Sequence, residues 1–379
     1  MTVAEPKPLG QLLLRSPRYG INAAAVPLGL GLPTYIRITD IDDSGRFAPD
    51  PKVGVSHPKS SDYRMRAGEL VFARTGASVG KSYLYDPRDG ELVYAGFLIN
   101  VAPDPTRLNP KYLSLFAQSK DYWDWIARTS VRSGQPGVNG QEYAQLPVPL
   151  PDIEVQNAIA NAFTDVDNLI GALERKIAKK HAIKQGMMQQ LLTGRTRLPG
   201  YTGEWAECHL GDVLAVRHGR NQRSVESPSG TVPILATGGQ IGWADRPLYS
   251  EPSVLIGRKG TIDRPQYQDR PFWTVDTLFY TEISTKADPR FLFYLFQTID
   301  WRSMNEASGV PSLSSTRIES VEVRLPGLAE QKAVREVLDD ADVETTVLRA
   351  RLAKARAIKT GMMQQLLTGR TRLPVEAAS

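Results

Sequence analysis

The chain repeats itself at a separation of 175 residues, and this repeat limits its possible folds more than any other feature. Residues 183–199 read IKQGMMQQLLTGRTRLP and residues 358–374 read IKTGMMQQLLTGRTRLP, so 16 of these 17 positions are identical. At the same offset, 25 of the 49 positions that begin at Pro151 and Pro326 match. The period is far longer than that of solenoid repeats. It therefore predicts two copies of one large unit.

The near-identical part of each copy is predicted to be one long helix. No proline interrupts residues 152–198 or 327–373. Apolar or small residues recur there in alternating steps of four and three, which is the pattern of a coiled-coil seam. The seam positions are Ile159, Phe163, Val166, Ile170, Leu173 and Ile177 in the first copy and Val334, Leu338, Ala341, Thr345, Leu348 and Leu352 in the second. Because neither helix can bury its seam alone, we expect the two to pack together; two unrelated core helices are the alternative.

The region before each helix repeats more loosely and is predicted to be an α/β globule. Residues 133–139 (SGQPGVN) match residues 308–314 (SGVPSLS), and short segments rich in Val, Ile, Phe and Tyr are typical of strands. Aromatic-rich helices are expected over Pro110–Arg128 and Pro289–Asn305, each starting at an Asn-Pro or Asp-Pro step. The predicted domains are a globule over residues 1–150, a helix over 151–199, a globule over 200–325 and a helix over 326–379.

Composition excludes several classes of protein. The single cysteine, Cys208, excludes a disulfide framework and a cysteine-ligated metal site, and it suits a reducing cytoplasm. No apolar run reaches the 18 residues that a membrane span needs, so we expect a cytoplasmic protein without membrane partners. The 46 Lys and Arg residues exceed the 41 Asp and Glu residues by only five, which does not by itself identify a polyanion-binding protein.

No motif predicts an active site. Residues 76–82 (GASVGKS) resemble a phosphate-binding loop, but only three residues separate the two glycines, and the loop should open a helix. Asp152, Glu174 and Lys176 match a nuclease pattern, yet the last two are expected on different faces of one helix and cannot converge on a metal. The four histidines are scattered. We therefore expect no catalytic residue, no metal ligand and no cofactor bound by this chain.

Basic and amide side chains at turns are instead candidates for contact with nucleic acid. A turn that presents backbone amides together with Arg74 and Lys81 suits DNA phosphates, while a plain hairpin with solvated charges is the alternative. Arginine and glutamine can read guanine and adenine, respectively, through paired hydrogen bonds. The candidates are Arg37, Thr39, Arg74, Thr75, Ser78, Lys81, Arg132 and Gln135 in the first globule and Thr237, Arg258, Lys259 and Thr261 in the second.

The helix ends are strongly basic. Residues 174–199 contain seven Lys or Arg residues against one Asp or Glu, and residues 349–372 contain seven against none. A solvated basic face is one interpretation. The other is that both helix ends contact a polyanion or an acidic partner.

Together these motifs resemble the specificity subunits of Type I restriction-modification systems, over essentially the whole chain. Residues 146–151 (LPVPLP) with Gln156, repeated as residues 323–326 (VRLP) with Gln331, are similar to the family's junction between domain and helix. Residues 74–80 (RTGASVG) are similar to an element of its recognition domains, although the second copy departs there with GRKGTI. The resemblance implies that partners bind at Gln156, Met187, Gln190, Leu191, Gln331, Met362, Gln365 and Leu366.

The resemblance also implies a function. Two target-recognition domains, joined by two helices in an antiparallel coiled coil with pseudo-two-fold symmetry, would each read one half of a bipartite site in double-stranded DNA. The chain would be a non-catalytic subunit. Two methyltransferase (modification) subunits would use S-adenosylmethionine, and motor-nuclease (restriction) subunits would use ATP and Mg²⁺. A coiled-coil scaffold without DNA readout and a single-chain nuclease are the alternatives.

Overall fold

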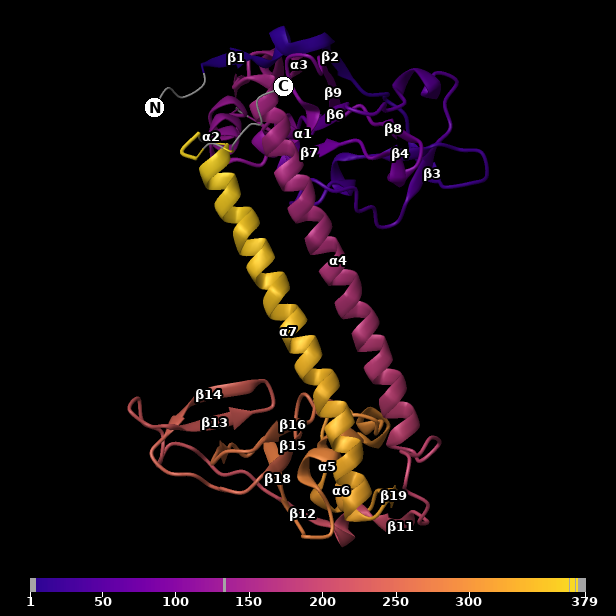
Figure 1. Ribbon diagram of the computed structural model, residues 1–379, viewed down its shortest axis with the longest axis vertical. Coiled ribbons are helices and arrows are strands. Elements are labelled where there is room, and N and C mark those ends of the chain that lie inside the picture. Colours follow the sequence, from indigo (N-terminus) through magenta and orange to yellow (C-terminus); the bar gives the residue numbers. More distant parts are fainter. Residues whose placement is uncertain (1–4, 132–133, 368, 372, 374–379) are drawn as a thin grey trace. The chain divides into compact units, whose positions relative to one another are not determined.

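A computed structural model describes residues 5–131, 134–367, 369–371 and 373. The chain divides into two compact units: unit 1 comprises residues 1–172 and 352–379, and unit 2 comprises residues 173–351. The boundary crosses two long helices, so each unit contains one globule and a segment of each helix (Figure 1). Among the described residues, no helix is long and apolar enough to span a membrane.

The two long helices, α4 (Ile153–Leu191) and α7 (Leu328–Leu366), carry the repeated seam. Each contains 39 residues. Ile159, Phe163 and Ile170 are buried along α4, and Val334 and Leu338 are buried along α7, while polar positions between them are exposed. Ile159 and Phe163 pack in the core of the unit 1 globule and Val334 and Leu338 in that of unit 2, so the globules cover this part of the predicted seam. The mixed α/β fold with two globules and two joining helices is therefore confirmed.

Within each unit the two helix segments run antiparallel. In unit 2, Lys180 Nζ lies 2.7 Å from Glu344 and Lys184 Nζ lies 2.5 Å from Asp342, so the numbering rises along α4 as it falls along α7. In unit 1, Asp167 lies 2.7 Å from Lys359 Nζ. Asp167 and Lys184 correspond to Asp342 and Lys359 in the repeat, so the sequence repeat produces the same ion pair twice.

The ion pair in unit 1 predicts a sensitivity to acid. Burial favours the neutral form of Asp167, but hydrogen bonds from Lys359 and Lys111 outweigh burial and lower its pKa. A lowered pKa in the folded state means that Asp167 stabilises unit 1 above the unfolded value of about 3.9, and that this stabilisation is lost as the pH falls through the folded pKa. We expect hydrogen exchange in residues 355–366, corrected for intrinsic rates, to accelerate below about pH 4. Asp167→Asn should abolish this part of the acid dependence and Asp165→Asn, at an exposed position of the same helix, should retain it; identical profiles for both variants would contradict the prediction.

The globule of unit 1 has two four-stranded sheets, with strand orders β2-β9-β6-β7 and β3-β5-β4-β8 (Figure 1). In the central strand β6, Leu70 and Phe72 pack in the core that includes the helices, whereas Val71 and Ala73 pack in the core that includes the second sheet. This alternation follows from the two-residue period of a strand. The strands are β1 (Pro6–Pro8), β2 (Leu13–Tyr19), β3 (Ala25–Pro27), β4 (Thr34–Ile36), β5 (Val53–Val55), β6 (Leu70–Ala73), β7 (Ser82–Leu84), β8 (Leu92–Tyr94), β9 (Leu98–Pro103) and β10 (Pro147–Pro149).

The globule of unit 2 follows the same plan, with strand orders β12-β18-β15-β16 and β14-β13-β17. In β15, Val254 and Ile256 belong to the core that includes the helices, and Leu255 belongs to a second core between the sheets. The strands are β11 (Ala206–His209), β12 (Leu214–Arg217), β13 (Val232–Ala236), β14 (Gly239–Ala244), β15 (Ser253–Gly257), β16 (Gln266–Gln268), β17 (Trp273–Thr274), β18 (Leu278–Ile283) and β19 (Glu322–Leu325).

The short helices differ from the prediction at their ends. The segment Pro110–Arg128 forms two helices, α1 (Pro110–Phe116) and α2 (Lys120–Thr129), because the Ser119 side chain accepts a hydrogen bond from Tyr122 N and caps a new helix. In unit 2, α5 (Pro289–Phe296) ends before Asn305, and a separate short turn follows it. Both α1 and α5 start at the expected proline, after a capping Asn109 or Asp288. The remaining helices are α3 (Gly140–Ala144) and α6 (Ser315–Glu319).

Candidate nucleic-acid interface

Both globules carry the same pair of loops, which begins where β6 or β15 ends. Arg74 N donates to Phe97 O at 3.0 Å, and Val138 N donates to Arg74 O at 2.8 Å. In unit 2, Arg258 N donates to Thr277 O at 2.8 Å, and Leu313 N donates to Arg258 O at 3.0 Å. Arg74 and Arg258 therefore occupy structurally equivalent positions, each held between a β-turn and a second loop.

A glycine two residues after each arginine joins the two loops through a backbone hydrogen bond. Gly76 has φ 71° and its N–H donates to Pro136 O at 3.1 Å; Gly260 has φ 90° and its N–H donates to Pro311 O at 2.8 Å. This left-handed conformation favours glycine because a side chain would be strained there. The Gln135 amide nitrogen would lie only 2.9 Å from a Cβ at position 76, so Gln135 packs directly over this turn. Arg74, Thr75 and Gln135 are thereby brought together, with Thr75 Oγ1 donating weakly to Pro136 O at 3.4 Å.

The guanidinium groups of the two arginines remain available for a ligand. The Arg74 guanidinium lies over the Tyr19 ring, 4.8 Å from its centroid, and Arg258 Nη1 donates to Asp276 O at 3.3 Å. Neither arginine forms an ion pair with a carboxylate of the described residues, and both side chains are partly exposed. A partly exposed, uncompensated guanidinium can bind a phosphate or the edge of a guanine.

The remaining candidates of this turn in unit 1, Lys81 and Ser78, are less available for contact with DNA. Lys81 Nζ forms an ion pair with Asp43 at 2.8 Å, which compensates its charge. Ser78 is partly exposed in a short helical turn that is followed by strand β7. Because a phosphate-binding loop must open a helix, the exclusion of that motif agrees with the structure.

Arg37 is occupied by a buried carboxylate. Its Nε and Nη2 donate to the two oxygens of Asp40 at 3.0 and 2.8 Å, and Asp40 is only 1% exposed. These hydrogen bonds raise the pKa of Arg37. We therefore assign Arg37 a structural role rather than base contact; Thr39, beside it, is exposed. Arg132 lies outside the described residues.

Three candidates gather around Gly260 in unit 2. The Thr237 hydroxyl would lie 3.7 Å from a Cβ on Gly260, Lys259 is exposed, and Thr261 lines an adjoining pocket of about 480 Å³. The pocket is also lined by Arg264 and Arg302, and Arg302 Nε lies 2.6 Å from Asp263. Arg302 is thereby compensated, whereas the exposed Arg264 is a candidate for the interface that sequence reasoning missed.

The two glutamines expected to bind a partner are buried inside the chain instead. Gln156 is 0% exposed and Gln331 is 1% exposed. The Gln156 Oε1 accepts from Asn109 N at 2.9 Å, and its Nε2 donates to Arg107 O and Pro151 O at 3.1 and 2.8 Å. The expectation that these glutamines contact a partner was wrong, because each side-chain amide forms hydrogen bonds that join the globule to the first turns of its long helix.

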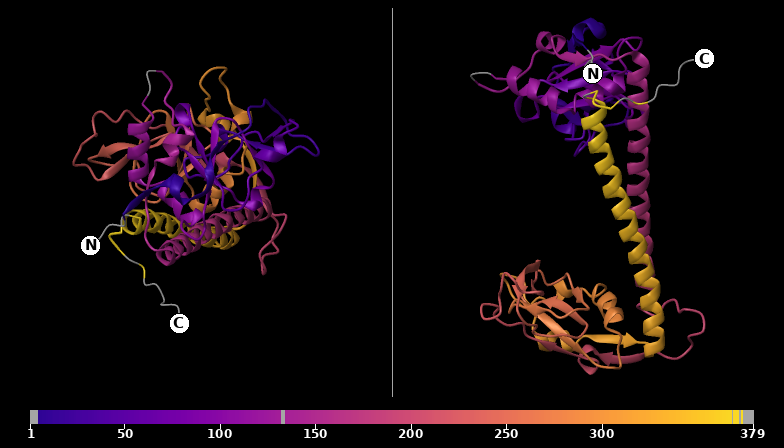
Figure 2. Two further views of the ribbon diagram at one scale, coloured as in Figure 1. Left: turned by 90° about the horizontal axis from the view of Figure 1, so that it is seen from above. Right: turned by 60° about the vertical axis from the view of Figure 1, so that its left-hand side comes forward.

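The leucines of the repeated helix ends are also buried within the chain. Leu191 is buried in a core of unit 2 and Leu366 in a core of unit 1, and Met187 and Met362 pack against the same cores. Figure 2 shows the last turns of α7, in yellow, lying against the globule of unit 1. Gln190 Oε1 and Gln365 Oε1 accept from Thr196 Oγ1 and Thr371 Oγ1 at 3.0 and 3.3 Å. Leu191 and Leu366 therefore pack within the chain rather than against a partner, whereas partner contacts at the partly exposed Met187 and Met362 and the exposed Gln190 and Gln365 stay predictions.

Other apolar residues of the helices are exposed. Ile183 and Ile358 occupy equivalent positions of the repeat and are 44% and 48% exposed. Leu169 in unit 1 and Val343 and Val347 in unit 2 are also exposed. Large apolar side chains in water indicate a contact surface when they recur on one element. The sequence signal was available, since Ile183 and Ile358 begin the near-identical segments.

The basic residues of the helix ends are partly compensated. Lys180, Lys184 and Lys359 form the interhelical ion pairs described above, and Arg197 binds Glu330 through two hydrogen bonds of 2.5 and 2.6 Å. These four basic residues therefore form ion pairs within their own unit. The surplus that remains is smaller than the sequence count indicates.

A known family model matches the chain twice, once in each copy of the repeat. The family model described as "Type I restriction modification DNA specificity domain" matches residues 49–183 and 202–355. The chain is 25% identical over 393 residues to the "Putative type I restriction enzyme MjaX specificity subunit" of Methanocaldococcus jannaschii, which covers 94% of this chain and 91% of that protein. It is 24% identical over 304 residues to the "Type I restriction enzyme MjaVIII specificity subunit" of the same organism, covering 69% and 70% of the two chains. The solved S subunit of a Type I restriction-modification system from M. genitalium has the same fold, with a TM-score of 0.65 at 15% identity over 95% of each chain.

Proposed function

Because the chain belongs to the family of Type I restriction-modification specificity subunits, we propose that its two globules read the two halves of a bipartite site in double-stranded DNA. The observation that carries this proposal is the loop pair that the two globules share. Each presents a partly exposed arginine, Arg74 or Arg258, on a turn held by a glycine and a proline loop. The side chains around the two turns differ, as two different half-sites require.

Base readout and phosphate contact are divided among these residues. Arg74 with Gln135, and Arg258 with Thr237 and Thr261, would contact base edges, because guanidinium and amide groups form paired hydrogen bonds with guanine and adenine. The exposed Lys259 suits a phosphate, a contact that positions the protein without reading sequence.

The chain is proposed to direct catalysis that its partners perform. Methylation would belong to two methyltransferase subunits that bind S-adenosylmethionine, and cleavage to motor-nuclease subunits that use ATP and Mg²⁺. The repeat supports two equivalent docking positions, since Ile183 and Ile358 are exposed at equivalent points of the two units. A repeated surface binds identical subunits in equivalent ways.

Selection of bound duplexes from a random pool tests the proposed recognition. The full chain, copurified with its modification subunits, should select a site with two short specified segments separated by unspecified base pairs. Exchange of residues 1–150 for the corresponding domain of a relative should change one specified segment and leave the other unchanged. A selected pool without any specified segment would favour the scaffold alternative, and simultaneous change of both segments would contradict independent reading.

The proposed docking surface is tested by a charge on the apolar helix face. Ile183→Asp and Ile358→Asp should each reduce the number of methyltransferase subunits per chain from two to one, because a buried unpaired charge opposes association. The double variant should bind none. Native mass spectrometry measures this stoichiometry. Gln185→Asp, at an exposed position of the same helix, is the control, and unchanged stoichiometry in the double variant would place the partners elsewhere.

A further inference from the structure

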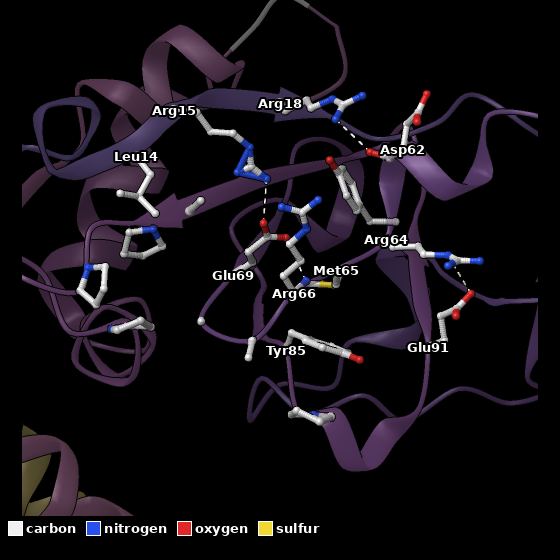
Figure 3. Close-up of a pocket in the computed structure, with 18 of the residues that line it drawn as sticks. Leu14, Arg15, Arg18, Asp62, Arg64, Met65, Arg66, Glu69, Tyr85 and Glu91 are labelled. Atoms are coloured by element: carbon white, nitrogen blue, oxygen red, sulfur yellow. Dashed lines mark hydrogen bonds and ion pairs between the residues drawn. The ribbon is translucent and has the colours of Figure 1, made fainter.

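A cleft of about 1140 Å³ opens beside β2 in the globule of unit 1 (Figure 3). Arg15 and Arg18 of β2 line this cleft, whereas Tyr19, which lies beneath Arg74, lines a different pocket. Arg64 and Arg66 complete a set of four arginines. The cleft is therefore a basic surface separate from the paired loops described above.

A buried polar cluster at the cleft fixes one of these arginines. Arg15 Nη2 donates to Glu69 Oε1 at 2.9 Å and to Asn100 Oδ1 at 2.7 Å. Asn100 Nδ2 and Arg66 N each donate to Glu69 Oε2 at 3.1 Å. Glu69 and Asn100 are buried, so the Arg15 guanidinium is held by groups that cannot move into water.

The arginines of the cleft have more donors than the protein uses. Both hydrogen bonds of Arg15 come from Nη2, which leaves Nε and Nη1 without a partner in the described part of the chain. The Arg66 guanidinium extends into the same part of the cleft (Figure 3) and has no side-chain hydrogen bond or ion pair to any described residue. Arg18 donates to Asp62 O at 2.9 Å and lies over the Tyr63 ring.

The acidic residues of the cleft do not cancel this charge. Arg64 pairs with Glu91 at 2.9 Å, and Glu69 pairs with Arg15. Four arginines against Asp62, Glu69 and Glu91 leave one positive charge in excess. The surplus lies on the side of Arg18 and Arg66.

The fold itself does not require the polar cluster, as the second globule demonstrates. Counting from the equivalent arginines Arg74 and Arg258, Glu69 corresponds to Ser253. The strand registers place Tyr280 where unit 1 has Asn100, and Ala215 where unit 1 has Arg15. Unit 2 builds the same sheet without the cluster. The fold therefore does not account for the cluster, and the Arg15 side chain that it holds is 38% exposed, open to a ligand in the cleft.

We propose that this cleft binds a phosphate group of the DNA backbone, with Arg15, Arg18 and Arg66 as its ligands. Planar guanidinium groups bind phosphate oxygens through paired hydrogen bonds, and an arginine held in place by Glu69 and Asn100 loses little further freedom on binding. The inference rests on the proposed DNA recognition and extends it. It adds a contact without sequence specificity, made by residues other than those of the base-reading turn.

Affinity measured against salt concentration tests the proposal. Arg66→Ala and Arg18→Gln, in the full chain with its modification subunits, should each lower affinity equally for cognate and scrambled duplexes and reduce the salt slope by about one. Arg46→Ala, an exposed arginine of the same globule, is the control and should leave both quantities unchanged. Thermal unfolding of each variant checks that the globule remains folded.

The outcomes separate this inference from the function on which it rests. Unchanged affinity and salt slope for both variants, while the wild-type chain binds its site, would overturn the inference alone; absence of specific binding by the wild-type chain would overturn the proposed function. Titration with inorganic phosphate and with ATP distinguishes the source of the phosphate group. Saturable binding of either one that Arg66→Ala abolishes, without effect on DNA affinity, would assign the cleft to a free anion and overturn its assignment to DNA.

Discussion

Replacement of Arg74 by alanine is expected to weaken binding of the cognate duplex by about 1–3 kcal/mol, roughly 5- to 150-fold, through loss of one half-site. The guanidinium is partly exposed, has no carboxylate partner in the described structure and is positioned by two backbone hydrogen bonds and the Tyr19 ring. Arg258→Ala should have an effect of similar size on the other half-site. Each variant should still distinguish the correct from a scrambled sequence at the half-site that the unaltered globule reads.

Four duplexes resolve these effects: the cognate site, each half-site scrambled alone, and both scrambled. Arg74→Ala should lose affinity only for the duplexes that retain the first half-site. Arg74→Lys should lose nearly as much discrimination, because an ammonium group keeps the charge but not the paired hydrogen bonds. Arg88→Ala removes an exposed arginine that is paired with Asp86 in the same globule and serves as the control. Equal losses on all four duplexes, with a salt slope lower by about one, would instead make Arg74 a phosphate contact.

The architecture was predictable because the sequence patterns that specify it are local and occur in both copies of the repeat. Two segments with the same seam spacing must bury the same face, and the turns at Arg74 and Arg258 are marked by a glycine whose conformation the structure requires. The loop partners at Pro136 and Pro311 were also visible as a weak match between the two copies.

The assignment of surfaces was not predictable in the same way. Leu191 and Leu366 were expected to contact a partner, yet both are buried in cores of this chain; Leu191 packs on the globule that follows it, and Leu366 packs on the globule at the other end of the sequence. A helix sequence shows which face is apolar, but not whether a neighbouring part of the chain or another protein covers it. The pairing of Arg37 with Asp40, three residues later, was in contrast a local signal that could have been recognised.

Replacement of Gln156 by leucine is expected to destabilise unit 1 by about 2–4 kcal/mol, since it leaves the Asn109 amide and the Arg107 and Pro151 carbonyls buried without their partner. Leucine fills a similar volume, so the cost comes from unsatisfied polar groups rather than from a cavity. Gln331→Leu should do the same to unit 2, because Gln331 Oε1 accepts from Asp288 N at 2.9 Å and its Nε2 donates to Pro326 O at 2.9 Å.

Native-state hydrogen exchange distinguishes the two variants, since it reports local unfolding within each unit, whereas one global transition does not describe a chain of several domains. Gln156→Leu should accelerate exchange in residues 108–116 and 153–165 and leave residues 287–296 and 328–340 unchanged; Gln331→Leu should give the opposite pattern. Asn161→Leu, at an exposed position of α4, is the control and should change neither region. Equal acceleration in both units by either variant would show that the glutamines act on the chain as a whole. Such a result would contradict the conclusion that Gln156 and Gln331 each join one globule to its own long helix.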